Sequence, residues 1–174
     1  MGGGTNLEGG ARPADKRALD ALHERIGFFC DDTRDCIKGN VFDAANAGYV
    51  NGAPQHGYDV LHSISAWRSG AHGFLPKRAG QVVQYVSAHD NYTLWDKLAA
   101  VGLRGDYDCP DADLLAQNRM TAGIYLTCQG LPFMQAGEEW AAPSTATTTA
   151  TRGRWPRTGW TGPAPTARSC RADG

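Results

Sequence analysis

The chain has 174 residues, with 17 Lys and Arg against 18 Asp and Glu, so its formal net charge is -1 at pH 7. This balance excludes, as a default, the basic surface that binds nucleic acid or an anionic membrane. Hydrophobic residues make up 41% and charged residues 20%, which is globular composition for one ordinary domain. Because the sequence contains neither a membrane-length apolar run nor an export signal, we expect a cytoplasmic protein.

The cysteine pattern argues against a disulfide framework and a metal site. Five cysteines, at positions 30, 36, 109, 128 and 170, include no Cys-x-x-Cys pair, and the five histidines show no ligand spacing around them. We therefore expect no metal and no other cofactor. Cys30, Cys36 and Cys128 are interpreted as small buried side chains in a reducing compartment, which again favours the cytoplasm.

The composition changes abruptly at about Trp140. Residues 1–140 contain 12 Lys and Arg against 17 Asp and Glu, whereas residues 141–174 contain five Arg, one acidic residue, eight Thr and seven Ala. The second segment has no Ile, Leu, Val, Phe or Met, so it cannot bury enough apolar surface to offset its ordering entropy. We expect residues 1–140 to form the folded domain and residues 141–174 to be an unstructured tail.

The predicted elements follow one another as strands and helices. Residues 25–30 predict a strand, and a helix capped by Asp32 or Thr33 follows and ends at Gly39. The next pair is a strand over 81–87 and an amphipathic helix over 93–101 that ends at Gly102. The clearest helix covers 111–127 and ends before Gly130, and the last strand covers 131–136, with Pro132 near its start.

Repeated strand and helix pairs of this length indicate a parallel α/β architecture. In such folds the active groups lie on loops that follow the carboxyl ends of the strands. Asp31, residues 89–91 and residues 138–139 each follow a predicted strand. We therefore expect these three groups to share one face of the molecule.

His89 and Asp90 have the chemistry to hold a neutral polyhydroxylated substrate. An ionised carboxylate accepts hydrogen bonds from two hydroxyl groups, and an imidazole donates another. Isolated His-Asp pairs also occur as helix caps or as salt-bridged surface groups. The pair alone leaves these alternatives open.

The sequence around this pair resembles a known enzyme family. Residues 85–97, Tyr-Val-Ser-Ala-His-Asp-Asn-Tyr-Thr-Leu-Trp-Asp-Lys, resemble the last signature region of type I pullulanases, debranching glycoside hydrolases of the α-amylase superfamily. Residues 25–39 resemble the segment around the sixth barrel strand of that family, and residues 130–139 resemble the eighth. Residues 2–5 and 13–16 resemble the stretch after the fifth strand. The resemblance implies a partial (β/α)8 TIM barrel that covers about strands 6 to 8.

The resemblance also implies roles for three consecutive residues. Asp90 would be the carboxylate that binds the distorted sugar at the cleavage point and stabilises the transition state. His89 would donate a hydrogen bond to the same sugar. Asn91 would support the site, with a cap on the following helix as its alternative. The implied partner is an α-glucan, such as pullulan, glycogen or a starch-derived oligosaccharide.

Several other residues are interpreted as structural. Arg34 and Asp35 lie in a first helical turn and are expected to form an ion pair. Glu138 and Glu139 are adjacent, so their side chains point to opposite sides, and both are expected to lie on the rim or a loop. Trp95 is expected in the core. Cys30 and Cys36 depart from the family, which usually has asparagine and a small residue there, and Cys30 could alter a hydrogen bond at the strand end.

The catalytic pair of the family is expected to lie outside this chain. A retaining glycosidase needs a nucleophile and a general acid about 5 to 5.5 Å apart, and the family carries them after its fourth and fifth strands. We therefore expect a fragment of an α-1,6-specific debranching enzyme that is inactive alone. The alternatives are a non-catalytic glucan-binding module and a truncated or miscalled reading frame without function, and we rank the reading-frame alternative above the module.

The composition of residues 141–174 also fits a frameshift. Every threonine codon begins with A-C, so a frame displaced by one base turns threonines into Asp, Asn, His or Tyr. Residues 142–151 then permit Arg-Pro-Lys-Tyr-Gly-Asp-Asp-Asn-Ser-Tyr, and the codons of Trp160 and Thr161 force an aspartate. The family continues with a similar Asn-Ser-Tyr and Asp-Trp pattern. A genuine Ala/Thr/Pro linker is the alternative.

Overall fold

The computed structural model describes residues 16–19, 22–73, 75–102 and 111–141. Its strands and helices are β1 (Phe28–Phe29), α1 (Asp31–Lys38), α2 (Gly57–Ile64), β2 (Val82–Gln84), α3 (Leu94–Gly102), α4 (Ala112–Tyr125) and β3 (Leu131–Pro132). Short 3-10 turns accompany them: η2 (Lys16–Ala18), η3 (Tyr49–Asn51), η4 (Pro54–His56), η5 (Ala71–Gly73), η6 (Ala79–Gln81) and η7 (Glu138–Trp140). The predicted tail lies outside the described residues from 142 onwards, as does the stretch at 2–5 and 13–15.

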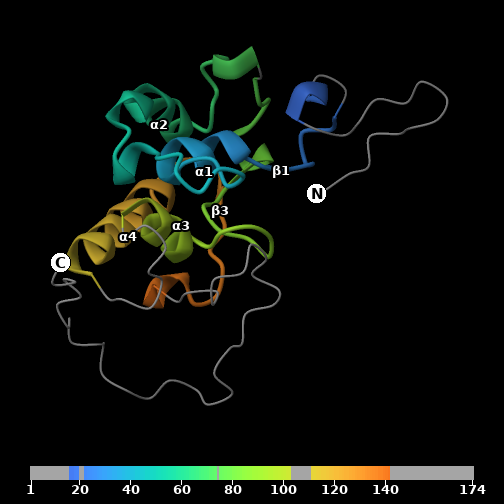
Figure 1. Ribbon diagram of the computed structural model, residues 1–174. Helices are drawn as coiled ribbons and strands as arrows, with labels where there is room; N and C mark the ends of the chain where they lie inside the picture. Colours follow the sequence, from blue (N-terminus) through green and yellow to red (C-terminus); the bar gives the residue numbers. More distant parts are fainter. Residues whose placement is uncertain (1–15, 20–21, 74, 103–110, 142–174) are drawn as a thin grey trace, which may run out of the picture.

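The three strands form one parallel sheet in the order β1-β2-β3. Helices α1 and α2 connect β1 to β2, and α3 and α4 connect β2 to β3. Figure 1 shows all four helices on one side of the strands. The parallel α/β architecture predicted from the sequence is confirmed, although each strand is shorter than its predicted range. Helix α2 was not predicted.

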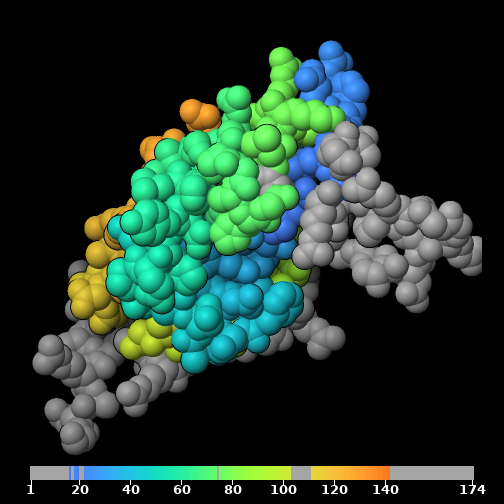
Figure 2. Space-filling model, turned by 90° about the horizontal axis from the view of Figure 1, so that it is seen from above, coloured from blue at the N-terminus to red at the C-terminus, as the bar shows by residue number. Residues whose placement is uncertain are grey.

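The hydrophobic core lies between the sheet and the helices. Because side chains alternate along a strand, Val82 points toward the helices and Val83 away from them. Val82 has no exposed surface and packs with a buried cluster from all four helices, which includes Ile37, Val60, Leu98 and Leu114. Helix α2 packs directly on α1, and from above it and its flanking segments cover much of that side of the molecule (Figure 2). The prediction that Trp95 belongs to the core is confirmed.

Gln84 joins the central strand to both connections. Its side chain is completely buried. Nε2 donates to the carbonyl oxygens of Ser63 and Gln129, both at 2.8 Å, and Oε1 accepts from the Thr33 hydroxyl at 2.7 Å. Because a buried amide without partners is costly, these three bonds hold β2 to α1, α2 and the segment after α4.

The opposite face of the sheet is only partly covered. Phe29 of β1 lies opposite Val83, and Val83 lies opposite Leu131 of β3, so the three side chains form a row. Phe29 is 40% exposed, Leu131 50% and Phe133 38%. The Phe29 ring makes edge contacts with the rings of Tyr85 and Phe133 at 5.0 and 5.1 Å. We call the side chains of Phe29, Val83, Leu131 and Phe133 the open face.

The helix ends match the predicted signals only in part. Helix α4 is capped by Asp111, whose carboxylate accepts from the backbone N–H groups of Asp113 and Leu114. Helix α1 begins two or three residues before the predicted start: its N-cap is Cys30, which makes no side-chain cap bond. The capping prediction for Asp32 or Thr33 was therefore wrong. Thr33 is buried instead, where its hydroxyl bonds Gln84 and the Trp67 indole.

A close approach of two backbone segments explains why glycines follow α1. Gly39 ends the helix at φ 95°, a conformation that favours glycine. A Cβ atom on Gly48 would lie 2.4 Å from the Gly39 nitrogen. The chain therefore returns tightly against the end of α1.

Three of the five cysteines lie among the described residues. Cys30, Cys36 and Cys128 are buried and free, as predicted. Burial raises the pKa of the Cys30 thiol to about 11, so the thiol stays protonated near neutral pH.

None of the described helices has both the length and the apolar character that crossing a bilayer requires.

Candidate functional site

His89, Asp90 and Asn91, which we call the triad, lie on the loop between β2 and α3, after the carboxyl end of the central strand. His89 and Asp90 are exposed, and Asn91 is half-buried. Asn91 has a left-handed backbone conformation, with φ 61°, which asparagine tolerates better than most residues. Its Nδ2 donates to Asp90 Oδ2 at 3.4 Å. The arrangement presents a carboxylate and an imidazole to solvent, where both can bind hydroxyl groups.

The structure assigns the helix cap to another residue than Asn91. The Thr93 hydroxyl accepts from the backbone N–H of Asp96 at 3.2 Å, in the first turn of α3. The Asn91 amide instead contacts the neighbouring carboxylate of Asp90. Asn91 therefore does not cap α3, and its supporting role stays a prediction.

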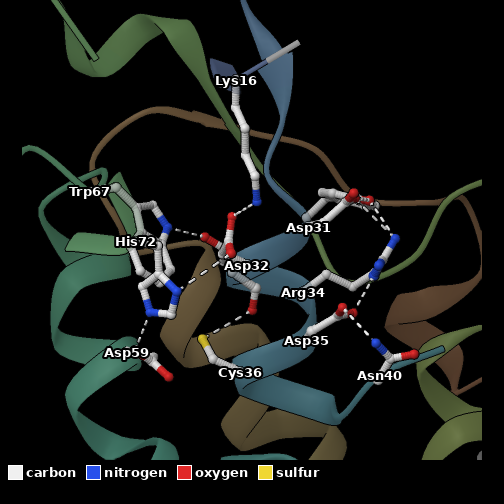
Figure 3. A network of polar contacts seen from close by, with 12 residues as sticks. Lys16, Asp31, Asp32, Arg34, Asp35, Cys36, Asn40, Asp59, Trp67 and His72 are labelled. Atoms are coloured by element: carbon white, nitrogen blue, oxygen red, sulfur yellow. Dashed lines mark hydrogen bonds and ion pairs between the residues drawn. The ribbon is translucent and has the colours of Figure 1, made fainter. Parts of the chain in front are cut away.

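Asp31 follows β1 and is tied to the end of β2 by a buried arginine. Arg34 Nη1 donates to Asp31 Oδ1 at 3.1 Å and to the Tyr85 hydroxyl at 2.9 Å, and Tyr85 donates to the same Asp31 oxygen at 2.6 Å. Arg34 Nε donates to Asp35 Oδ1 at 2.6 Å, which confirms the predicted ion pair (Figure 3). Burial opposes the charge on Arg34, but the hydrogen bond to Asp35 raises its pKa above the usual range.

A polar hollow of about 370 Å³ lies beside this cluster, between α1 and α2. Asp32 pairs there with Lys16 and lies 3.9 Å from His72, which bonds Asp59 at 2.8 Å (Figure 3). Although partial burial opposes ionisation, the hydrogen bonds from His72 and His56 lower the pKa of Asp59. The described residues include no cluster of three His, Cys, Asp or Glu side chains placed to hold a metal ion.

Glu138 differs from its prediction as a rim carboxylate. It follows β3 in η7 and is only 9% exposed. The Tyr125 hydroxyl donates to Oε1, whereas Oε2 is buried and has no hydrogen-bond partner among the described residues. Burial raises the pKa of this carboxyl group. Glu139 is exposed, so the prediction holds for Glu139 alone.

Two buried residues below the triad were not singled out from the sequence. Lys38 ends α1 and has no exposed surface. Its Nζ donates to the carbonyl oxygen of Tyr92 at 2.7 Å, and burial lowers its pKa to about 7. Ser87 is also buried, and its hydroxyl accepts from the backbone N–H of Leu94 at 2.7 Å. A lysine in the last helical turn usually remains in solvent, so the sequence carried no signal of this contact.

The predicted common face is therefore partly formed. Parallel strands bring their carboxyl ends to one edge, and Asp31 accepts a hydrogen bond from Tyr85, which follows β2. No hydrogen bond or ion pair joins either carboxylate to Asp90 within the described part of the chain. Glu138 is buried, whereas the carboxylates of Asp31 and Asp90 are both exposed, and that of Asp31 is bonded to Arg34 and Tyr85.

Solved structures similar to this chain include pullulanases. The type I pullulanase from Bacillus subtilis, complexed with maltose, matches 72% of this chain and 17% of its own, with a TM-score of 0.63 and 31% identity. A mutant of the pullulanase from Paenibacillus barengoltzii, complexed with maltotetraose, matches 79% of this chain and 21% of its own, with a TM-score of 0.69 and 28% identity. The chain is thus similar in fold to part of a class of glycoside hydrolases.

Curated sequences give the same result. The pullulanase of Bacillus subtilis strain 168 is 35% identical over 117 residues, which are 66% of this chain and 16% of that enzyme. The pullulanase of Klebsiella pneumoniae is 31% identical over 119 residues, 67% of this chain and 10% of that enzyme. No protein-family model matches. The chain is therefore pullulanase-like, as its motifs predicted, and it spans about one sixth of the length of the Bacillus subtilis relative.

Proposed function

We propose that residues 1–140 form the C-terminal part of a pullulanase-like (β/α)8 TIM-barrel catalytic domain, covering about strands 6 to 8. Three adjacent parallel strands with helices on one side support this arrangement. The open face supports it too, because the inner side of a barrel strand packs against the strands across the barrel. The domain acts on α-glucans such as pullulan, glycogen or starch-derived oligosaccharides.

The observation that carries the proposal is the exposed carboxylate of Asp90 on the loop after the central strand. In this role Asp90 accepts hydrogen bonds from the hydroxyl groups of the sugar at the cleaved α-1,6 bond. Those bonds strengthen as the ring distorts, so Asp90 stabilises the transition state more than the bound substrate. His89 binds the same sugar, and Asn91 orients the Asp90 carboxylate through its amide.

A chimaeric enzyme tests this role. The matching segment of the Bacillus subtilis pullulanase is exchanged for that of this chain, and the chimaera is assayed on pullulan with and without Asp90→Asn. We expect kcat to fall on the order of 100-fold or more while KM changes much less. Asp113→Asn is the matched control, because Asp113 is exposed on α4. A change in KM alone would contradict the transition-state role.

The 174-residue chain is expected to be inactive alone, because the proposed domain needs a nucleophile and a general acid from the preceding part of the barrel. Sugar release from pullulan by the purified chain, abolished by Asp90→Ala, would contradict this. Glucan binding without hydrolysis would instead favour the alternative of a glucan-binding module. Calorimetry with maltotetraose, on the wild type and on Asp90→Ala, distinguishes the two.

For residues 141–174 we infer a displaced reading frame rather than a domain of the enzyme. The absence of Ile, Leu, Val, Phe and Met and the excess of Arg and Thr support this inference. The nucleotide sequence of codons 138–174 tests it. If the frame displaced by one base lacks the Asn-Ser-Tyr and Asp-Trp pattern, or contains early stop codons, the tail is native.

A further inference from the structure

The loop that carries His89, Asp90 and Asn91 is held at its base by two buried side chains. The Ser87 hydroxyl accepts from the backbone N–H of Leu94 at 2.7 Å and so joins the two ends of the loop. Lys38 Nζ reaches the carbonyl oxygen of Tyr92, next to Asn91, at 2.7 Å. Both side chains are at most 1% exposed, so water does not compete effectively for these bonds.

The loop includes an uncommon backbone conformation at Asn91. Asparagine tolerates the left-handed region, here φ 61°, better than most residues, and contacts on both sides of Asn91 stabilise it. On one side of this residue, the Asn91 side-chain amide donates a hydrogen bond to Asp90. The Lys38 bond to Tyr92 lies immediately on the other.

Buried groups from two further elements surround the anchor. Glu138 of η7 is 9% exposed, and its Oε1 accepts from Tyr125 at the end of α4. Its other oxygen is buried without a partner among the described residues. Of the three N–H donors of the Lys38 ammonium group, one is accounted for by Tyr92. Burial and the charge of Arg34 lower the pKa of Lys38, and the Glu138 carboxylate acts in the opposite direction.

We propose that Lys38 is a positioning residue that fixes the 88–93 loop, and through it the orientation of Asp90, by its bond to the Tyr92 carbonyl. The positioning itself follows from the contacts of the loop. Its consequence for glucan binding rests on the function proposed above.

The chain offers a matched control in Lys97. Lys97 is also without exposed surface, but its Nζ donates to the carbonyl oxygens of Asp43 and Ala44, in a different loop. Lys38→Met and Lys97→Met therefore remove the same buried ammonium group from two places. A general loss of stability affects both loops in both variants, whereas loss of an anchor affects one.

Hydrogen exchange of the full chain, followed by mass spectrometry, tests the anchor. In Lys38→Met, we expect exchange of the amides over 88–93 to accelerate at least 10-fold and exchange over 41–46 to change less than 3-fold. Lys97→Met should show the reverse pattern. Lys38→Gln, which keeps a donor, should give an intermediate exchange rate over 88–93. If Lys38→Met does not fold, the exchange rate of Lys38→Gln is the test of the anchor. Equal acceleration in both loops, or no change over 88–93, overturns the proposal.

Maltotetraose binding by the same variants connects the anchor to Asp90. If the wild type binds, Lys38→Met should weaken binding several-fold more than Lys97→Met. Equal weakening in both variants counts against a role of the anchor in ligand binding. If the wild type does not bind but the loop-specific exchange appears, Lys38 positions the loop and the proposed glucan binding by this chain fails.

Discussion

The two faces of the sheet have different surroundings although the same strands form both. On the helix side, Val82 and Gln84 have no exposed surface. On the open face, Phe29 and Leu131 are 40% and 50% exposed. An α/β domain usually covers both faces of a parallel sheet, so the described residues contain one complete layer and an apolar surface suited to a second. Stability and association should therefore depend on different faces.

The largest expected effect on stability appears when a leucine-to-alanine substitution in the core is compared with the same substitution on the open face. Leu98→Ala removes a side chain without exposed surface from the core, and it should lower the free energy of unfolding by about 2 to 5 kcal/mol. Leu131→Ala on the half-exposed side should cost about 1 kcal/mol or less. Urea unfolding followed by circular dichroism measures both. Equal losses would contradict the difference between the faces.

The packed side also makes stability depend on pH. The unfolded chain protonates Lys38 up to about pH 10.5, whereas the folded chain, where the pKa of Lys38 is about 7, releases that proton earlier. Between these values the unfolded state binds more protons, so the free energy of unfolding rises with pH, by at most about 1.4 kcal/mol per pH unit. Above pH 9 the raised pKa of Cys30 acts in the opposite direction.

Unfolding at several pH values from 7 to 9 tests this dependence. The rise should be smaller in Lys38→Met than in the wild type. The charged groups that act on Lys38 are Arg34, Asp35, Glu138 and Lys97. Lys97→Met should still show the part of the increase in the free energy of unfolding that Lys38 causes. Identical slopes in the wild type and Lys38→Met would rule out this source.

A smaller gain is expected at the start of α1. Cys30 has the extended conformation of an N-cap but makes no side-chain cap bond. Cys30→Asn supplies a cap acceptor, and we expect it to stabilise the chain by about 1 kcal/mol. Cys30→Ala, which supplies no acceptor, is the control and should not stabilise. If asparagine does not raise the denaturation midpoint above that of alanine, the missing cap has no energetic importance.

The smallest effect on stability is expected from a charge on the open face. Leu131→Lys should change the free energy of unfolding by only about 0.5 kcal/mol, since the side chain is half-exposed. It should nevertheless reduce self-association measured by sedimentation, because a lysine on an edge strand opposes pairing. Leu61→Lys, 62% exposed on α2, is the control. Equal reduction by both variants would mean that association does not involve the open face.

The fold was predictable where local signals agree with burial. Helix α4 was predicted to within two residues at each end, because Asp111 is a good cap and an apolar pattern follows it. Helix α2 was missed, since Tyr58, Leu61 and Ile64 are exposed. The large apolar residues of α2 therefore do not indicate which face of the helix packs against the core.

The candidate site was predictable where its residues are consecutive. His89, Asp90 and Asn91 stand together in one motif, so their shared loop follows from the sequence. Lys38 could not be found in this way, because its partner Tyr92 lies 54 positions away. Glu138 looks like a surface residue in the sequence, but it is buried in the structure, where Tyr125 donates a hydrogen bond to it.

The three bonds of Gln84 have a consequence for the folding pathway. Its partners Thr33, Ser63 and Gln129 lie 51, 21 and 45 positions away along the chain. A folding intermediate that contained only one of the two connections would bury this amide with a bond unmade, and such an intermediate is penalised. The connection through α1 and α2 and the connection through α3 and α4 should therefore assemble in one cooperative step, and kinetic traces from the two halves should coincide.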